Sequence, residues 1–402
     1  MLVYWIWYAL LPELSLRQKC QILQYFSDPE DIYHTESFRH IQELTPEAVA
    51  TLENKDLTTA RQVVKNCKDK HIGILTFRDA AYPSRLRNIP DPPLVLYYKG
   101  ILPDFELQPT VAVVGTRKAS PYGLRHARSI CRELAACGGL VISGGAAGVD
   151  SMALQGALDV GAQTVAVLGC GVDVVYPRTN RKLFADIEAK GCLLSEYLPG
   201  TQPLPWQFPA RNRIISGLAA GALVVEAPEK SGALITARSA LEQGRDVFVI
   251  PGNIDAVTSA GSNALLRDGA SAVFTGWDVL RDYAPAYPDT VCKRTEPEIG
   301  AMQSRAKVAQ PVVFPWETEA GNKKVVDNPI VNAYSDLENT GFQPDAEEKQ
   351  ILACLTSSPR PMDDVIAQAG LPAGKVLSIL TRLSVKGVVI QHPGRLVSVN
   401  LR

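Results

Sequence analysis

Between residues 71 and 284, short apolar runs rich in β-branched residues alternate with longer amphipathic segments. The predicted strands are 72–77, 94–98, 110–115, 140–145, 164–169, 192–197, 222–227, 247–252 and 272–275. The predicted helices between them include 122–137, 149–160, 180–190, 211–220 and 233–243. This alternation predicts an α/β domain in which a mostly parallel sheet is covered by helices on both faces.

Residues 1–70 carry apolar side chains at helical spacing, which predicts an N-terminal helical bundle. Thr45-Pro46 is typical of an N-cap followed by proline in the first turn. The apolar run 1–11 stops at Pro12 and lacks a basic leader, so we expect a buried helix rather than a signal peptide. The bundle is helix-hairpin-helix-like or SAM-like. Since no G-x-G hairpin links its helices, we favour a structural or interaction role over DNA binding.

Between residues 285 and 344 the periodicity fades into proline, glutamate, lysine and asparagine, which indicates a flexible linker. Order returns over 345–402. Helices are predicted at 347–355, 362–368 and 375–385, and hairpin strands at 388–391 and 396–399. This is the pattern of a winged helix, and its third helix carries Lys375, Arg382 and Lys386 without an acid. Such modules contact DNA or proteins, and the sequence leaves both roles open.

Composition excludes some classes of protein. The 402 residues include 41 lysines and arginines against 42 acids, a net charge of -1, so the chain is not basic throughout, although a local basic cleft is compatible with this sum. The eight cysteines form no C-x-x-C pair, which argues against a zinc or redox site and favours reduced thiols in the cytoplasm. No stretch is long and apolar enough to cross a bilayer, so we expect a soluble protein without membrane insertion.

Candidate chemistry lies at the predicted strand ends, because open parallel sheets bind ligands there. Gly115, Thr116 and Arg117 combine a close backbone approach, a hydroxyl and a guanidinium suited to phosphate. The loop S-G-G-A-A-G-V-D at 143–150 leads into a helix whose first N–H groups can hold an anion. A third polar, glycine-rich end spans 168–182. Tight turns alone would explain one such loop, but three together favour phosphate binding.

The motifs of common nucleotide-dependent enzymes are missing. The glycines run G-G-x-x-G and G-x-G-x-x-V rather than G-x-G-x-x-G, and no G-K-[ST] follows them. The sequence presents no Ser/His/Asp or Cys/His constellation. We therefore expect no enzyme activity, no cofactor and no metal.

Residues 206–217 place aromatic rings beside arginines. Trp206 and Phe208 precede Arg211 and Arg213 at a predicted helix start, where positive charge opposes the helix dipole unless an anion lies nearby. Rings that stack bases and arginines that follow the backbone are the components of a single-strand binding surface. In the alternative interpretation the rings belong to the core and the arginines pair with Glu196 or Glu226.

The ordered motifs between residues 79 and 270 add a resemblance to these arguments. They include V-G-T-R, S-G-G-A-x-G-V-D, L-G-x-G-x-D-x-x-Y-P-x-x-N, F-P-x-R-N-R-I-I-S-G-L, S-G-A-L-I-T-A and P-G-N. As a set they resemble the DprA/Smf family, the DNA-processing proteins of bacterial natural transformation. The resemblance implies an extended Rossmann-like sheet, flanked by the N-terminal helical bundle and the C-terminal winged helix. It also implies a non-enzymatic homodimer that binds single-stranded DNA, protects incoming strands and loads the RecA recombinase.

The resemblance further implies which residues form the DNA site. Those expected to hold the phosphate and its surroundings are Gly115, Thr116, Arg117, Ser143, Gly144 and Gly145. The basic rim would be Arg178, Arg181 and Lys182, and the pocket would be completed by Phe208, Arg211, Asn212 and Arg213. A dimer interface would lie near Asn263, Leu265 and Leu266.

One rival function shares the predicted fold. Phosphoribohydrolases of the lysine-decarboxylase-like type also carry a G-G-x-x-G loop and act on nucleotides. Their P-G-G-x-G-T-x-x-E element is missing here, since Pro251-Gly252 is followed by Asn253-Ile254-Asp255. Fold alone does not separate the two functions.

Overall fold

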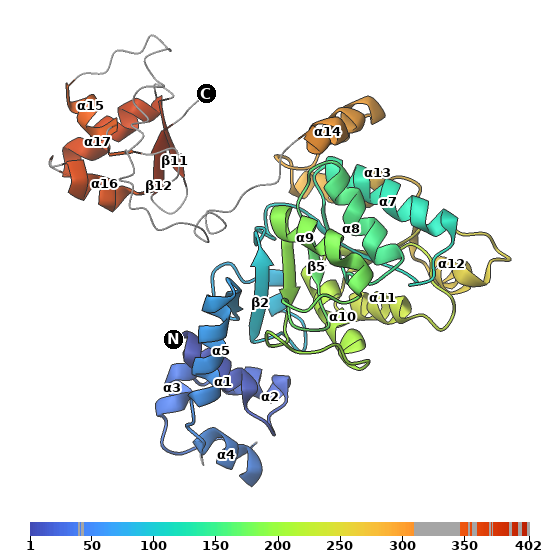
Figure 1. Ribbon diagram of the computed structural model, residues 1–402, viewed down its shortest axis with the longest axis horizontal. Helices are drawn as coiled ribbons and strands as arrows, with labels where there is room; N and C mark the ends of the chain where they lie inside the picture. Colours follow the sequence, from blue (N-terminus) through green and yellow to red (C-terminus); the bar gives the residue numbers. More distant parts are fainter. Residues whose placement is uncertain are drawn as a thin grey trace, which may run out of the picture. The chain divides into compact units, whose positions relative to one another are not determined.

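The computed structural model describes residues 1–38, 41, 44–308, 346–352, 354–355, 360–369, 371, 373–385, 388–392 and 396–399. The chain divides into two compact units, Met1–Val313 and Phe314–Arg402. The first unit holds the helical bundle and the large sheet, and the second holds a small helical domain with three strands (Figure 1).

The N-terminal bundle consists of α1 (Leu2–Leu10), α2 (Leu16–Ile22), α3 (Pro29–His34), α4 (Pro46–Glu53) and α5 (Thr58–Asp69). Ser15, Asp28 and Thr45 cap α2, α3 and α4 by accepting backbone N–H groups. The predicted buried first helix is confirmed, because α1 buries Trp5 and its three successors. Lys19 is also buried, and its ammonium group donates to the carbonyls of Ala9 and Leu11 at 2.8 Å each. Burial lowers the pKa of Lys19 to about 8.

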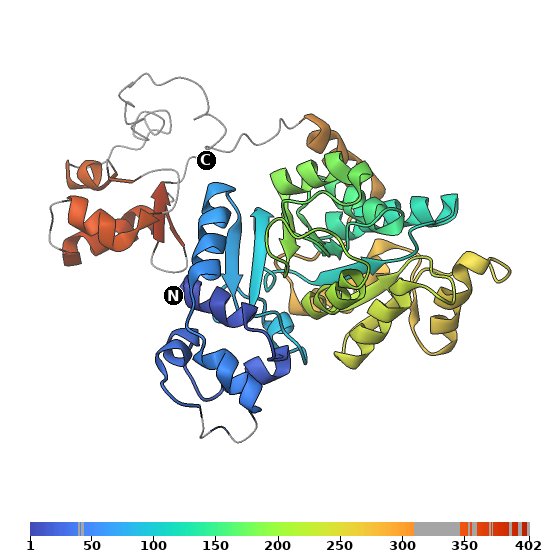
Figure 2. The same ribbon diagram turned by 60° about the horizontal axis from the view of Figure 1, so that its bottom comes forward.

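The bundle shares a hydrophobic core with the sheet. Val95 and Tyr97 of β2 (Val95–Gly100) pack with the apolar side chains of the N-terminal helices, as does Val172. An ion pair of 2.6 Å between Lys70 and Asp173 crosses the same boundary. Both views show the N-terminal helices beside β2 (Figures 1 and 2).

The described residues of the first unit form one nine-stranded sheet. Besides β2 it contains β1 (Gly73–Thr76), β3 (Thr110–Val114), β4 (Leu140–Ser143), β5 (Thr164–Val167), β6 (Cys192–Ser195), β7 (Gly221–Val224), β8 (Asp246–Val249) and β9 (Ser271–Ala272). The order is β1-β2-β6-β5-β4-β3-β7-β8-β9. Pairing is parallel from β6 to β9 and antiparallel at β1–β2 and β2–β6. Each strand falls within or overlaps a predicted one, so the mostly parallel sheet is confirmed.

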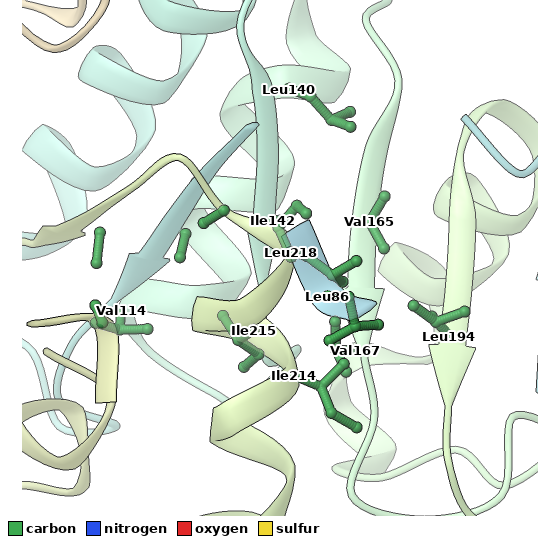
Figure 3. Close-up of a cluster of buried hydrophobic side chains, with 14 of the residues drawn as sticks. Leu86, Val114, Leu140, Ile142, Val165, Val167, Leu194, Ile214, Ile215 and Leu218 are labelled. Atoms are coloured by element: carbon green, nitrogen blue, oxygen red, sulfur yellow. The ribbon is translucent and has the colours of Figure 1, made fainter. Parts of the chain in front are cut away.

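Helices cover both faces of the sheet. They are α6 (Ser84–Arg87), α7 (Pro121–Ala136), α8 (Val149–Asp159), α9 (Arg181–Lys190), α10 (Gln207–Leu218), α11 (Gly232–Glu242), α12 (Ala260–Arg267), α13 (Gly276–Leu280) and α14 (Glu296–Val308). Ala112 and Val114 of β3 face α6, α10 and α11, in the cluster of Figure 3. Val111 and Val113, the alternate positions, face α7, α8 and α13.

The chain reverses its direction of travel across the sheet between β3 and β7. From β3 it proceeds through β4 and β5 to β6, and then crosses back to place β7 on the other side of β3. Loops that follow β3 and β7 therefore diverge to opposite faces and leave a crevice at the carboxyl ends of the strands. The predicted ligand loops lie at this crevice.

The predicted linker is wrong over its first part. Residues 284–286 form a 3-10 turn, and α14 occupies 296–308. Val291 and Ile299 are buried against the α7–α8 face of the sheet. Of the prolines in this part, Pro285 and Pro288 stand at turns and Pro297 lies in the first turn of α14, where proline is compatible with order. The remainder of the predicted linker, 309–344, lies outside the described residues.

The second unit contains α15 (Ala346–Leu352), β10 (Arg360–Pro361), α16 (Met362–Ala369), α17 (Ala373–Val385), β11 (Val389–His392) and β12 (Leu396–Val399). Its strands pair in the order β10-β12-β11. Three helices with a β11–β12 hairpin confirm the predicted winged helix, and β10 is an additional short strand. Of its predicted cations, Arg382 pairs with Glu348 at 3.2 Å, and Lys386 lies outside the described residues. Within the described ranges of both units, no helix has the length and apolar character needed to span a membrane.

Candidate nucleic-acid interface

A cleft of about 650 Å³ lies at the point where the strand order reverses. It is formed by the loops that follow β3 and β7 together with the first turns of α10 and α11. Its polar and aromatic lining comprises Thr116, Arg117, Lys118, Asp150, Phe208, Arg211, Asn212, Lys230, Ser231, Thr236 and Thr258. A second cavity of about 170 Å³ shares Arg117, Ala146 and Phe208 with it and extends to Gly169 and Tyr176. The two cavities together cover the ends of β3, β4, β5 and β7.

Arg117 provides an exposed positive charge on this cleft. Its guanidinium carbon lies 5.1 Å from the centre of the Phe208 ring, a cation–π contact that orients the side chain. Among the described residues no acid forms an ion pair with it. The turn that carries it is fixed, because the N–H of Thr116 donates to the carbonyl of Glu226 at 2.7 Å. Arg117 is therefore held in place on the cleft, and its binding of a phosphate stays a prediction.

Gly115 allows α8 to pack closely against the turn after β3. A side chain at position 115 would come within 2.5 Å of Val149 at the start of α8. The hydroxyl of Thr116 accepts the N–H of Lys118 at 3.2 Å and still has its own proton to donate. The strand-to-helix turn is thus tight because α8 approaches it closely, and the approach leaves Thr116 and Arg117 on the cleft.

The predicted anion loop after β4 supports the cleft from behind. Ser143 is buried and its hydroxyl donates to the carbonyl of Val113 at 2.6 Å, so it does not face the ligand. A side chain at Gly144 would come within 2.5 Å of Arg211 and 2.7 Å of Asp150. Gly145 has a φ of 67° and its carbonyl accepts from the side chain of Asn180 at 2.9 Å. The hydroxyl of Ser143 is therefore occupied within the fold, whereas Gly144 lines the smaller cavity beside Arg117. A phosphate contact by this loop stays a prediction.

Arg211 links α10 to the ends of β4 and β5 by hydrogen bonds. It is buried, and its guanidinium donates to the carbonyl of Gly144 at 2.7 Å and to that of Val167. Burial lowers the pKa of Arg211 to about 10, while the nearby Asp150 raises it, so the group stays charged at neutral pH. Burial also raises the pKa of Asp150, which Arg211 opposes. Because α10 begins at Gln207, Arg211 lies one turn inside the helix rather than at its predicted start, on the floor of the cleft.

Arg213 belongs to the fold and not to the cleft. Its guanidinium forms two hydrogen bonds of 2.6 and 2.9 Å with the Glu196 carboxylate, and its Nε donates to the carbonyl of Asp91 at 3.0 Å. The structure favours the alternative interpretation, in which Arg213 pairs with Glu196, and DNA binding by Arg213 stays a prediction. The other acid considered, Glu226, instead accepts the N–H of Ser120 at 2.8 Å at the start of α7.

The predicted basic rim is exposed. Arg178 opens a short 3-10 turn, and Arg181 and Lys182 form the first turn of α9. None of the three forms an ion pair within the part of the chain that the structure describes. They follow directly on Tyr176 and Pro177, which line the smaller cavity. The rim therefore continues the positive charge of the site along the chain.

Three residues of the site are missing from the predicted DNA-binding residues. Lys118 and Lys230 are exposed and line the main cleft. Tyr176 lies with its ring centre 5.5 Å from that of Phe208. Position relative to the motifs could have indicated them, since Lys118 follows Arg117 directly and Lys230 precedes the N-cap Ser231 of α11.

The residues predicted for a dimer interface have contacts within the chain. The Asn263 amide donates to the carbonyl and accepts the N–H of Gly252, both at 3.1 Å. Leu265 and Leu266 pack partly buried against the core of the sheet. Their contact with a second copy stays a prediction.

Comparison with known proteins places this architecture in a family. The family model described as DNA recombination-mediator protein A matches residues 73–284, and the DprA winged helix domain matches 336–395. Protein Smf of Synechocystis is 38% identical over 336 residues, which cover 83% of this chain and 81% of that protein. DNA processing protein DprA of Streptococcus pneumoniae is 45% identical over 209 residues, 51% of this chain and 72% of that one. The X-ray structure of DprA from Streptococcus pneumoniae aligns with a TM-score of 0.57 at 36% identity, covering 70% of this chain and 98% of that chain.

Proposed function

Because the chain belongs to the DprA/Smf family of DNA recombination-mediator proteins, we propose that it binds single-stranded DNA in the cleft around Arg117. The observation that carries this proposal is the guanidinium of Arg117, oriented by Phe208 at 5.1 Å and paired with no acid in the described chain. Lys118 and Lys230 add two exposed charges to the same cleft. Cations that follow a phosphate backbone beside aromatic rings suit a strand whose bases are unpaired.

The finer steps rest on family membership. In this proposal the protein acts in the cytoplasm as a homodimer, protects strands taken up in natural transformation and loads the RecA recombinase onto them. A strand bound through its phosphates at the cleft would keep part of each base accessible, which a recombinase requires. A strand-exchange assay with RecA and a single-strand binding protein as competitor tests loading directly.

We further propose that the protein acts without catalysis. The cleft presents guanidinium, ammonium, hydroxyl and amide groups, and its one acid, Asp150, is buried next to Arg211. The rival function requires the carboxylate that ends the P-G-G-x-G-T-x-x-E element. This chain has P-G-N-I-D in place of that element. Release of free base from nucleoside monophosphates would revive the rival and overturn this part of the proposal.

The central experiment measures how well unlabelled single-stranded and duplex DNA displace a labelled single-stranded oligonucleotide from the full chain. Fluorescence anisotropy of the label follows the displacement. We expect single strands to compete far better, and Arg117→Ala to weaken binding about 10-fold or more, the usual effect of losing a charge-assisted hydrogen bond. Each phosphate contact adds about 0.7 to the slope of log affinity against log salt, so Arg117→Ala should lower that slope by about this amount.

Arg17→Ala is the matched control. Arg17 is an exposed arginine of α2 in the N-terminal bundle, so its removal changes the net charge equally while leaving the cleft intact. Equal affinities for the Arg117 and Arg17 variants would contradict the proposed function. Equal affinity of the wild type for duplex and single strands would contradict it as well.

A further inference from the structure

Trp206 is an exposed aromatic ring beside the cleft. Its side chain is 62% exposed, compared with 41% for Tyr176, and it stands immediately before the first residue of α10. Its neighbours Pro205 and Phe208 line the cleft. A single exposed apolar side chain is common on proteins, so exposure alone assigns no role to Trp206.

The Trp206 ring is also held in a defined orientation. Its centre lies 6.1 Å from that of Tyr197, and the two planes meet at 78°. Tyr197 is fixed in turn, because its hydroxyl donates to the carbonyl of Gln207 at 3.3 Å and its N–H donates to Ser195 at 3.0 Å. In an edge-to-face contact the edge of one ring meets a face of the other, so Tyr197 covers at most one face of the indole.

The ring of Phe208, by contrast, is surrounded by other residues of the chain. The Arg117 guanidinium lies 5.1 Å from its ring centre, and the Tyr176 ring lies 5.5 Å away. On a further side the ring packs on Gly169, where an added Cβ would come within 2.9 Å of it. Phe208 therefore positions Arg117, and it offers little free ring surface to a base.

We propose that Trp206 is a base-stacking site for an unpaired nucleobase of the strand whose phosphate binds Arg117, with Tyr197 as the residue that positions the indole. The inference rests on the proposed single-strand binding and names the ring that contacts a base there. Stacking needs only a flat π surface, so this site accepts any of the bases. It requires that the base be unpaired and turned out of a duplex.

The test uses the full chain and a labelled oligothymidylate. From the strength of stacking on an aromatic side chain, Trp206→Ala should weaken single-strand binding about 5- to 100-fold, and Trp206→Phe should keep most of the affinity. Tyr25→Ala is the matched control, because Tyr25 is a ring of similar exposure, 65%, that lies in the N-terminal bundle away from the cleft. Tyr197→Leu should cause a smaller loss than Trp206→Ala, since it only releases the indole.

Tryptophan fluorescence supplies a readout that a purely structural role would not change. Stacking quenches indole emission, so saturating oligonucleotide should quench the wild type, and Trp206→Phe should lose most of this quenching. Trp206→Ala should unfold at the wild-type urea midpoint, because the side chain is mainly exposed.

The outcomes separate the inference from the function on which it rests. Wild-type affinity of Trp206→Ala together with persistent quenching in Trp206→Phe, while Arg117→Ala loses binding, would overturn the stacking site and leave the proposed function intact. An equal loss of duplex and single-strand binding in Trp206→Ala would also overturn it, because stacking requires an unpaired base. Wild-type binding by Arg117→Ala would instead contradict the proposed function itself.

Discussion

Replacing the buried Arg211 by methionine should destabilise the first unit and distort the cleft. Methionine keeps much of the volume but removes the charge and the donors that reach the carbonyls of Gly144 and Val167. Hydrogen bonds from a charged donor contribute about 1.5–3 kcal/mol each, and Asp150 would lose the cation that opposes its burial. We therefore expect the free energy of unfolding to fall by about 3–5 kcal/mol, as for other broken buried charge pairs.

The pH dependence of this loss has a definite sign. Burial already raises the pKa of Asp150, and removal of Arg211 raises it further. Above the ordinary aspartate pKa the unfolded carboxyl loses its proton before the folded one, so the unfolding free energy falls as the pH rises through that window. The destabilisation by Arg211→Met should consequently be smaller near pH 5 than near pH 8. Asp150→Asn in the same chain should recover part of the loss at pH 8.

Urea unfolding followed by tryptophan fluorescence measures these changes in the first unit. Four of the five tryptophans, Trp5, Trp7, Trp206 and Trp277, lie in that unit, and the fifth, Trp316, lies outside the described residues. Arg211→Lys is the control for charge, since it retains a cation without the forked donors. A wild-type midpoint for Arg211→Met would refute the reasoning, and so would a further loss on adding Asp150→Asn.

Three other substitutions test separate parts of the structure. Arg213→Ala should lower the unfolding free energy by about 1–3 kcal/mol, because it breaks the two bonds to Glu196, yet leave oligonucleotide affinity unchanged; a large loss of affinity in anisotropy titrations would return Arg213 to the site. Gly115→Ala should cost about 1–3 kcal/mol through overpacking against Val149, and Val149→Ala should relieve it in the double variant, as thermal melting can show. Lys19→Met tests a titration. The folded pKa of Lys19, about 8, lies below its unfolded value, so above pH 8 the unfolded state binds more protons than the folded state. The free energy of unfolding of the wild type relative to Lys19→Met should therefore increase between pH 7.5 and 9.5, as measured by urea titrations. A constant difference would show that Lys19 does not titrate there.

The strands and the location of the cleft could be predicted because parallel strands covered on both faces have a recognisable sequence pattern. Their β-branched runs and the glycine-rich turns that follow them are local features. The predicted start of α10 lies one turn too late, since Phe208 and Pro209 are weak helix formers whose placement in the first turn depends on tertiary contacts.

The roles of individual arginines could not be predicted from sequence. Arg117, Arg211 and Arg213 all stand in glycine- or asparagine-containing motifs. In the structure, Arg117 stacks on an aromatic ring, Arg211 donates to backbone carbonyls, and Arg213 pairs with an acid. The difference depends on partners that lie far away in the chain: Val167 is 44 residues from Arg211, and Glu196 is 17 residues from Arg213. The order of residues 285–308 was missed for a similar reason, because the burial of Val291 and Ile299 depends on α7 and α8.

The packing of Val95 and Tyr97 against the N-terminal helices determines where this chain can be cut. A fragment starting at residue 71 would expose the apolar side chains of Val95 and Tyr97 on β2, the second strand of the sheet, and would lose the Lys70–Asp173 ion pair. We expect such a fragment to aggregate, whereas a chain that ends after residue 308 keeps all the described helices and strands of the first unit. A shortened version for crystallisation should thus be trimmed after residue 308 and keep its first seventy residues.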